Sequence, residues 1–480
     1  MRVRRSVVVG AVLLFAFGLG VDAPAAVAGS RTPLVVDDDR AQCPGAGYTA
    51  IQPAIDAADA GDTVRVCGGT YPGDLYINNA VSLIAHAPAA PSVDCVAGAA
   101  AGAASTIIGA VVLTGTGATV DGFVVTGAST GITSSDQGSG YQIRRNVIEG
   151  NHDYGIELQS GGQRRTVVEN NCVRGNGTEV PRAGIASENG ALRNAVIRGN
   201  TTARNFESIS VDGAFPHTDI SISGNTIRQE SYGLVVSGTV GSDLTGNDID
   251  FTGFASRATG IVVGEANVGL TVASNTVAGA FPGLFFQHRD GSPPSVAVYV
   301  ATNTFRNNAG TAISSLGSGN VGRSLLYRNV LTGNVGSGIF LGVGDDGNAL
   351  IGNQSTNNAR GINLGGATST LVVGNTMSGN TLVDARDAAS VQNIWIANRC
   401  NNADPATLCS APAAASAATA QGAQTASTAP PVVSARPKVG QSRWPCLQVP
   451  VWDVDPVDGG TWVWITVVAP DAPAGTYCGT

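Results

Sequence analysis

The sequence predicts an all-β fold, a right-handed parallel β-helix (solenoid) in which the chain winds into stacked coils. Three observations predict it: an asparagine that recurs every 22 to 30 residues, apolar residues at fixed offsets from it, and a repeated glycine–aliphatic pair. A repeat of this length is typical of solenoids, whose units bury their apolar faces only against neighbouring units. The recurring asparagines are Asn146, Asn170, Asn200, Asn225, Asn247, Asn275, Asn303, Asn329, Asn353, Asn375 and Asn398.

Two apolar columns flank the recurring asparagine. All residues three positions before it are apolar, from Ile143 to Trp395, and most residues two positions after it are apolar, from Ile148 to Cys400. Coils that stack at the strand spacing of about 4.8 Å bring like positions above one another. Asparagine suits a recurring turn, and its amide can bond to the next one along the stack. We therefore expect a ladder of asparagines inside the coil.

A glycine followed by Ile or Leu marks a further strand, as in Gly155-Ile156 and Gly338-Ile339. Alternation along a strand sends the first and third residues after the glycine inward and the second outward. The outward residues are then Glu157, Ala186, Ser210, Val235, Val262, Phe285, Phe340 and Asn363.

The ends of a solenoid need covers. Ile51, Ala54, Ile55 and Ala58 share one face at helical spacing, which predicts a short capping helix before a strand at 63–66. At the other end, we expect Trp395 and the small loop between Cys400 and Cys409 to close the last coil.

The chain divides into four predicted segments. Residues 1–28 have the basic start, apolar middle and small-residue end of a signal peptide. The β-helix occupies 29–409, a low-complexity linker 410–439, and a small segment rich in Trp and Cys 440–480, interpreted either as a sugar-binding module or as a stapled appendage. No later stretch is apolar enough to cross a bilayer. We expect a secreted or envelope-associated monomer.

Eight cysteines in an exported chain favour disulfides over metal or catalytic sites. Spacing suggests the pairs Cys43–Cys67, Cys400–Cys409 and Cys446–Cys478. The pairing of Cys95 and Cys172 stays open. Because the net charge is −8 and no basic patch stands out, we exclude nucleic acid as a partner.

The N-terminal stretch carries a family resemblance. Tyr48-Thr49-Ala50-Ile51-Gln52-Pro53-Ala54-Ile55, followed by Gly61-Asp62-Thr63-Val64 and Gly69-Thr70-Tyr71, resembles the opening of pectin methylesterases and of many secreted proteins of the pectin-lyase-like superfamily. The resemblance covers about residues 40–405. It implies the β-helix fold, but the catalytic motifs of methylesterases, polygalacturonase-like hydrolases and alginate epimerases are absent, so no catalytic residue is carried over.

Candidate site residues come from position alone. Glu157, Glu188 and Asp212 fall on or beside one outer face in early coils, with His217 in the loop after Asp212, and these four are candidate catalytic groups. Stacking separates carboxylates by about 5 Å over one coil and about 10 Å over two, which neither forbids nor requires a glycosidase pair. Arg182 is a candidate ligand for a uronate carboxylate.

Later coils place Phe285 and Phe340 on the same face, where aromatic rings can stack on sugars. Asp345-Asp346-Gly347 is a candidate calcium loop or an ordinary turn. No other cofactor is expected.

Three function hypotheses follow. The first is a secreted protein that binds, and as a lyase or hydrolase degrades, acidic polysaccharide along the outer face. The second is a non-catalytic envelope or matrix protein for structure or adhesion. The third is a periplasmic metal-delivery scaffold, because copper accessory proteins of nitrous oxide reductase share the coil; four His and two Met make a poor set of copper ligands. The sequence leaves open whether the protein is an enzyme.

Overall fold

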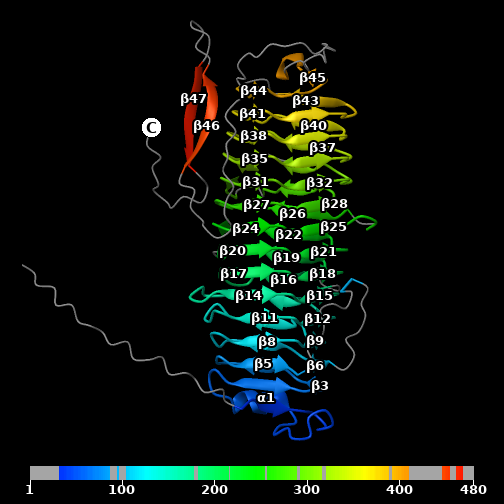
Figure 1. Ribbon diagram of the computed structural model, residues 1–480, viewed down its shortest axis with the longest axis vertical. Helices are drawn as coiled ribbons and strands as arrows, with labels where there is room; N and C mark the ends of the chain where they lie inside the picture. The colour runs from blue at the N-terminus through cyan, green and yellow to red at the C-terminus, as the bar shows by residue number, and fades with distance from the viewer. Residues whose placement is uncertain are drawn as a thin grey trace, which may run out of the picture. The chain divides into compact units, whose positions relative to one another are not determined.

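The computed structural model describes residues 32–86, 95–96, 104–177, 182–213, 215, 217–254, 257–288, 292–315, 320–388 and 392–409, and the backbone of 446–453 and 461–468. The predicted signal peptide, the whole linker 410–439 and Cys478 of the predicted Cys446–Cys478 pair lie outside these residues. The described chain winds into a stack of coils, with successive strands contributed in turn to three parallel sheets (Figure 1). This confirms the predicted parallel β-helix, and a parallel crossover of this kind is right-handed in nearly all proteins.

Sheet I has 16 strands: β1 (Leu34–Val36), β2 (Thr63–Val66), β5 (Ser82–Ala85), β8 (Thr119–Asp121), β11 (Gln142–Arg144), β14 (Thr166–Glu169), β17 (Leu192–Arg198), β20 (His217–Ser223), β23 (Thr239–Val240), β24 (Asp243–Thr245), β27 (Thr271–Ala273), β31 (Tyr299–Ala301), β35 (Leu325–Tyr327), β38 (Ala349–Ile351), β41 (Leu371–Val373) and β44 (Ile394–Ile396).

Sheet II has 13 strands: β3 (Gly69–Pro72), β6 (Ser105–Ile108), β9 (Val124–Thr126), β12 (Val147–Glu149), β15 (Cys172–Arg174), β18 (Thr201–Ala203), β21 (Thr226–Arg228), β25 (Asp248–Asp250), β28 (Thr276–Ala278), β32 (Thr304–Arg306), β36 (Val330–Thr332), β39 (Gln354–Thr356) and β42 (Thr376–Ser378).

Sheet III has 14 strands: β4 (Leu75–Ile77), β7 (Val111–Leu113), β10 (Ile132–Ser134), β13 (Ile156–Glu157), β16 (Ala183–Ser187), β19 (Glu207–Val211), β22 (Tyr232–Val236), β26 (Thr259–Val263), β29 (Leu284–Phe286), β33 (Ile313–Ser315), β37 (Ser337–Leu341), β40 (Arg360–Leu364), β43 (Val383–Asp387) and β45 (Ala403–Asp404).

Two strand pairs lie outside these sheets. They are the short parallel pair β30 (Ser295–Val296) and β34 (Val321–Gly322), and the antiparallel hairpin β46 (Cys446–Asp453) and β47 (Thr461–Val468).

An asparagine ladder runs through the interior at the corner between sheets I and II. Asn225 shows the pattern: its backbone N–H and its Nδ2 both donate to Asn247 Oδ1 at 3.0 Å, and Nδ2 also donates to the Ile197 carbonyl. Each buried amide is thereby satisfied by the neighbouring coils, which is what burial of a polar group requires. The ladder consists of Asn146, Asn171, Asn200, Asn225, Asn247, Asn275, Asn303, Asn329, Asn353, Asn375 and Asn398.

The prediction of Asn170 was wrong by one residue, because this coil carries two adjacent asparagines. Asn170 is exposed and has the left-handed backbone (φ 55°) that other residues adopt just before a ladder position, such as Arg145 and Ser274. Asn171 makes the ladder bonds instead. The shift moves Cys172 out of the core: it lies outside sheet II against Val124 and Val147 and forms a disulfide with Cys95.

A second ladder, which the sequence analysis missed, lies five residues after the first. Its side chains bond between coils in the same way, and it occurs in two runs separated by coils with Thr252 and Ala280 at this position. The first run is Asn151, Asn176, Asn205 and Glu230, and the second is Asn308, Asn334, Asn358 and Asn380, which ends on Asp384, four residues later in the same coil.

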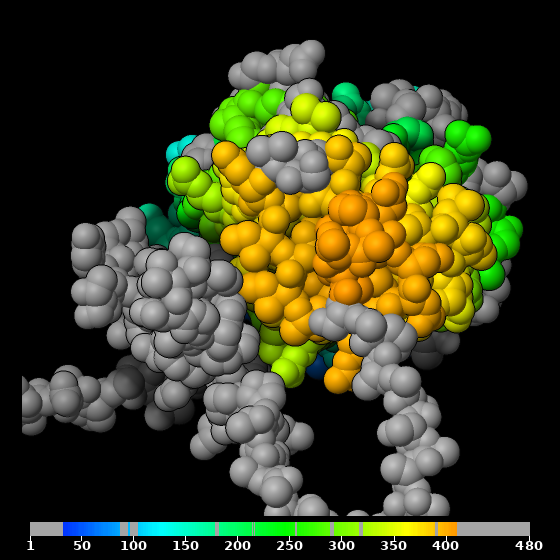
Figure 2. Space-filling view, turned by 90° about the horizontal axis from the view of Figure 1, so that it is seen from above, coloured from blue at the N-terminus to red at the C-terminus, as the bar shows by residue number. Residues whose placement is uncertain are grey.

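Covers lie at both ends of the coil. Helix α1 (Ile51–Asp56) buries Ile51, Ala54 and Ile55 against the first coil. At the far end, Trp395 donates from Nε1 to Asp387, and the 3₁₀ turn η1 (Ala406–Leu408) lies within the loop closed by the Cys400–Cys409 disulfide. Residues near 400, orange in the space-filling view, lie across this end (Figure 2). Within the described residues, no helix is long and apolar enough to span a membrane.

Candidate functional site

The outer face of sheet III carries the positions that the sequence analysis singled out. Strand pairing places Glu157, Ala186, Ser210 and Val235 in one column, in register between neighbouring coils. A second column, three residues earlier in the chain, contains Ala183, Glu207 and Tyr232. Ala183, Ala186 and Ser210 are almost completely buried although they point away from the core. Larger neighbouring side chains must therefore fold over them.

We call the side chains that gather here the glutamate cluster: Tyr154, Arg182, Glu188 and Glu207. The Tyr154 hydroxyl donates to Glu188 Oε2 at 2.8 Å, and Arg182 Nη1 lies 3.4 Å from the same oxygen. The Arg182 guanidinium also lies over the Tyr154 ring, 5.4 Å from its centroid. Tyr154 packs on Ala183 and Ala186, and these small residues leave the space that the larger side chains fill.

Glu207 completes the cluster one coil further on. Its pKa is raised to about 7, chiefly by burial; the nearby carboxylates of Glu188 and Asp212 also raise the pKa, whereas a hydrogen bond with Ser210 and the charge of Arg182 lower it. At neutral pH this carboxyl is therefore divided between its acid and carboxylate forms, which is the condition for exchanging a proton with a bound ligand. Burial and the bond to Glu188 raise the pKa of Tyr154, so this phenol keeps its proton.

Glu157 lies beside the cluster. Its Oε1 accepts from Asn189 Nδ2 at 2.6 Å, and its Oε2 accepts from the Thr133 hydroxyl at 3.3 Å. Asp212 is near enough to raise the pKa of Glu207. Of the four predicted catalytic residues, the structure thus brings Glu157, Glu188 and Asp212 to one region of the outer face, together with Arg182.

His217 does not join them. It begins β20 in register with Leu192 and Thr239, both of which are buried inside the coil, and its side chain has no exposed surface. Desolvation lowers its pKa, and its contact with Asp212 is to the backbone carbonyl, at 3.3 Å. The prediction of His217 as a catalytic group is therefore wrong, because the loop after Asp212 returns the chain into the coil wall.

The predicted aromatic residues occur further along the same face. Phe285 and Phe340 are half-buried and lie two coils apart, with Ser314 between them in register. The Phe340 ring lies over Gly365 of the next coil, where a Cβ would come within 2.6 Å of the ring. The Phe340 ring thus covers a small residue in the way that the glutamate cluster covers Ala183 and Ala186.

Two members of the cluster, Tyr154 and Glu207, were missed in the sequence. Tyr154 precedes Gly155-Ile156, and Glu207 occupies the same position before Ser208-Ile209. The sequence analysis considered only positions that follow the glycine, so the residue before it was not considered, either in the coil of Tyr154 or in the coil where Ser208 replaces the glycine. Aligning coils on Ile209 and reading the position two residues before each aliphatic residue would have found both.

Asp345, in the candidate calcium loop, has a structural role. Its carboxylate accepts from Ser315 Oγ, the Val321 N–H and the Gly342 N–H, and it is buried. Those bonds hold a turn together, so the structure gives no support to calcium binding here.

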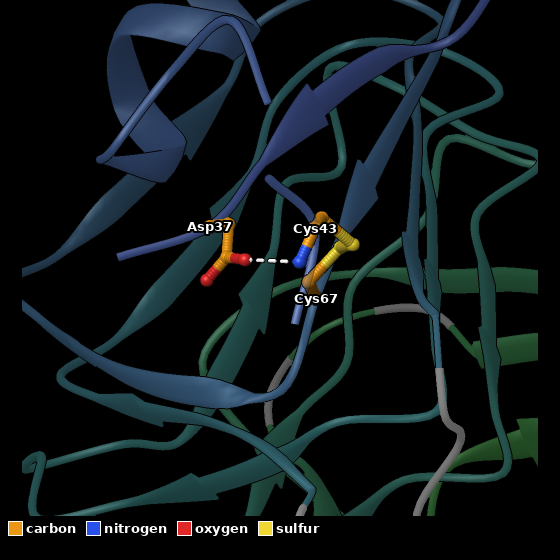
Figure 3. A group of neighbouring side chains, drawn as sticks. All are labelled: Asp37, Cys43 and Cys67. Atoms are coloured by element: carbon orange, nitrogen blue, oxygen red, sulfur yellow. Dashed lines mark hydrogen bonds between the residues drawn. A yellow bond between two sulfur atoms is a disulfide. The ribbon is translucent and has the colours of Figure 1, made fainter. Parts of the chain in front are cut away.

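Two groups of potential metal ligands occur among the described residues, and both contain Asp37: one with Cys43 and Cys67, the other with Asp38 and Asp39. Cys43 and Cys67 form a disulfide, and the Cys43 N–H donates to the Asp37 carboxylate (Figure 3). Asp38 accepts from the Thr70 N–H. These carboxylates therefore serve to close the first loop.

Comparison with known proteins identifies the family. The family described as "Periplasmic copper-binding protein (NosD)" matches residues 103–280 and 251–405, together more than half of the 480 residues. The chain belongs to this family. No curated protein matches it.

Solved structures are similar in fold, as NosD-family membership implies. The A-module of mannuronan C-5 epimerase AlgE4 from Azotobacter vinelandii is 15% identical, with a TM-score of 0.42, over 78% of this chain and 96% of the other. A family 28 exopolygalacturonase from Yersinia enterocolitica is 13% identical, with a TM-score of 0.41, over 64% and 76%. The catalytic unit of an α-1,3-glucanase from Streptomyces thermodiastaticus is 14% identical, with a TM-score of 0.42, over 79% and 71%.

The described residues do not fit the copper site that the NosD family name implies. Copper in proteins takes imidazole, thiolate and thioether ligands. The six cysteines described are all in disulfides, and Met377 is in the core. The four histidines, His86, His152, His217 and His288, enter neither group of potential ligands found in this part of the chain.

Proposed function

We propose that the protein binds an extracellular polysaccharide along the outer face of sheet III and that Glu207 and Glu188 exchange protons with it. The observation that carries the proposal is the glutamate cluster, in which a carboxyl with a pKa of about 7 lies beside a second carboxyl on a strand face. A proton donor near neutrality next to a carboxylate suits the cleavage of a glycosidic bond. Half-buried Phe285 and Phe340 would extend the surface by stacking on sugar rings.

The charges of the cluster favour a neutral polysaccharide over an acidic one. Glu157, Glu188, Glu207 and Asp212 are opposed by Arg182, and Arg182 is engaged by Glu188. A uronate carboxylate would therefore meet excess negative charge and would have to displace an existing ion pair. This revises the expectation of an acidic substrate, in which Arg182 was to neutralise a uronate.

Export is part of the proposal. The signal-peptide pattern at residues 1–28 and the three disulfides support a location outside the cytoplasm, at the envelope or beyond it.

The test is a panel of neutral and uronate-containing polysaccharides, with binding measured by affinity electrophoresis and turnover by release of reducing ends and by absorbance of unsaturated products. We expect binding to neutral chains, and loss of turnover in Glu207→Gln. Glu169→Gln is the matched control, because Glu169 pairs with Arg198 on the outer face of sheet I. Binding restricted to uronate-containing polysaccharides, or equal turnover by Glu207→Gln and wild type, would contradict the proposed role of the glutamate cluster.

A second candidate function is a non-catalytic envelope or matrix protein. It is favoured by the engagement of Glu188 Oε2, which both Tyr154 and Arg182 already contact. In that case the same panel gives binding without turnover, and Phe285→Ala and Phe340→Ala weaken binding while Glu207→Gln does not.

A further inference from the structure

The outer face of sheet I changes character along the coil. In register, the two outward columns of the early strands carry polar or charged residues at most positions, such as Gln142 and Arg144 in β11 or Asp243 and Thr245 in β24. From β31 onward every outward position is apolar. We call these ten positions the apolar face: Tyr299, Leu325, Ala349, Leu371, Ile394, Ala301, Tyr327, Ile351, Val373 and Ile396.

These residues are not part of the core. Their inward neighbours Val300, Leu326, Leu350 and Val372 fill the coil interior and are fully buried. On the apolar face, Ile394 is 53% exposed, and the other long side chains are half-buried. The Tyr299 and Tyr327 rings stack with centroids 6.5 Å apart. A contiguous apolar patch on a strand face indicates a surface that another element covers.

The hairpin β46–β47 has a matching pattern. Leu447 pairs with Val467, Val449 with Ile465, and Val451 with Val463. Alternation along the two strands therefore assigns these six aliphatic positions to one face of the hairpin, with the pair Asp453–Thr461 at its end. The other face includes Gln448, Thr466 and three tryptophans. A two-stranded hairpin is marginal by itself and needs an apolar surface to pack on.

We infer that the apolar face of sheet I is the docking surface for the aliphatic face of the hairpin β46–β47 of the same chain. The five strands of the apolar face span about 20 Å, and an eight-residue strand of the hairpin is about 27 Å long, so the two surfaces are of similar size. Face-to-face packing of two sheets at about 10 Å would bury both sets of aliphatic side chains.

The length of the linker permits this docking. The described coil ends at Cys409 and the hairpin begins at Cys446, with a linker rich in Ala, Ser, Thr and Pro between them. If the 36 residues between them followed random-coil statistics, their root-mean-square span would be about 33 Å. The last strand of the apolar face, β44, lies in the final coil next to the start of the linker, so tethering raises the local concentration of the hairpin at its own chain above that of a second copy.

The test is hydrogen exchange of the full chain, followed by mass spectrometry of peptides covering 446–468. We expect the hairpin amides to exchange at least about tenfold more slowly in wild type than in Leu371→Lys, which puts a charge within the apolar face, on β41. Val330→Lys is the matched control, because Val330 is 37% exposed on the outer side of sheet II. Peptides covering Val300 and Leu326 report whether the coil itself stays folded.

A second variant pair tests the hairpin side. Val449→Lys, on the aliphatic face, should release the hairpin, whereas Gln448→Lys, on the other face, should not. The inference is overturned if the hairpin amides are unprotected in wild type, if Leu371→Lys and Val330→Lys leave the same protection, or if protection falls on dilution, which would make the occupant a second copy. Protection that appears only on adding a polysaccharide would also overturn it.

Discussion

Glu207 and Glu230 lie in neighbouring coils, and burial raises the pKa of both, yet they lie on opposite sides of the coil wall. Glu207 is on the outer face beside Arg182, Glu188 and Asp212. Glu230 is completely buried inside, where Oε1 accepts from Asn205 Nδ2 at 3.0 Å and Oε2 has no hydrogen-bond partner among the described residues. A raised carboxyl pKa therefore marks burial, and only access to a ligand makes it a candidate site.

The second ladder makes the same point from the inside. Asp384 ends the later run, and Asn380 Nδ2 donates to its Oδ1 at 2.7 Å while the Asn401 N–H donates to its Oδ2 at 2.8 Å. Glu230 ends the earlier run without an equivalent donor for its second oxygen. A buried carboxyl can therefore replace a ladder amide when a backbone N–H donates to its second oxygen, as at Asp384. Where no such donor is present, as at Glu230, the second oxygen is buried without a hydrogen bond, which costs free energy.

The largest expected effect is a difference in the free energy of unfolding between two variants, each of which removes a hydrogen-bond partner of one glutamate. Asn205→Ala deletes a ladder amide and leaves Glu230 with less compensation in the core, so we expect a loss of about 3 kcal/mol in the free energy of unfolding. Ser210→Ala removes the corresponding bond of Glu207, and we expect a loss below about 1 kcal/mol because water can reach that carboxyl. Chemical denaturation of both variants measures the difference, and equal losses would contradict the inside–outside distinction.

Glu230→Gln should stabilise the protein at alkaline pH. Because the pKa of Glu230 is raised in the folded state, its contribution to stability is complete below its unfolded pKa of about 4.3 and is lost as pH rises toward the folded value. We expect Glu230→Gln to be about 2–3 kcal/mol more stable than wild type at pH 8, and to lose this advantage at pH 4. Glu265→Gln, on a surface turn, is the control. A variant whose advantage is the same at both pH values would show that charge is not the cause.

Glu207→Gln should change how the stability of the protein depends on pH around neutrality. The folded pKa of about 7 lies above the ordinary value, so the stabilising contribution of Glu207 is present below about pH 4.5 and is lost as pH rises through 7. We expect wild type to lose about 1–2 kcal/mol relative to Glu207→Gln between pH 5 and pH 8, a smaller change than at Glu230 because solvent screens the outer face. Thermal unfolding across this range measures it, and parallel pH profiles would refute the assignment.

Asn170→Ala should have the smallest effect. Asn170 is an exposed turn residue, and replacing it costs below about 1 kcal/mol for the left-handed backbone. Asn171→Ala, one residue later, removes a ladder member and should cost several times more. If the two variants unfold at the same temperature, the ladder runs through Asn170 after all.

The fold was largely predictable, and the site was partly predictable, for different reasons. The inward-facing residues are similar in every coil, because each coil must present the same shape to the next. This similarity appears in the sequence as a regular repeat. Glu188 and Arg182 were also found, since both fall next to the Gly-Ile strand. Tyr154 and Glu207 were missed because they belong to the cluster through contacts between side chains on the outer face. The sequence repeat does not show which outer side chains contact one another.

By itself, the sequence determined the coil, its period, the inner ladder apart from one register slip, and two disulfides at the ends of the coil. Tertiary structure alone decided that Asn171 rather than Asn170 joins the ladder, that Cys172 faces outward to Cys95, and that His217 is fully buried in the coil wall while Glu207 is half-buried on the outer face. The physical reason is that stacking requires similar residues at the inner positions of every coil. On the outer face and at the corners, a loop that is longer or shorter by one residue moves a side chain from one side of the coil wall to the other.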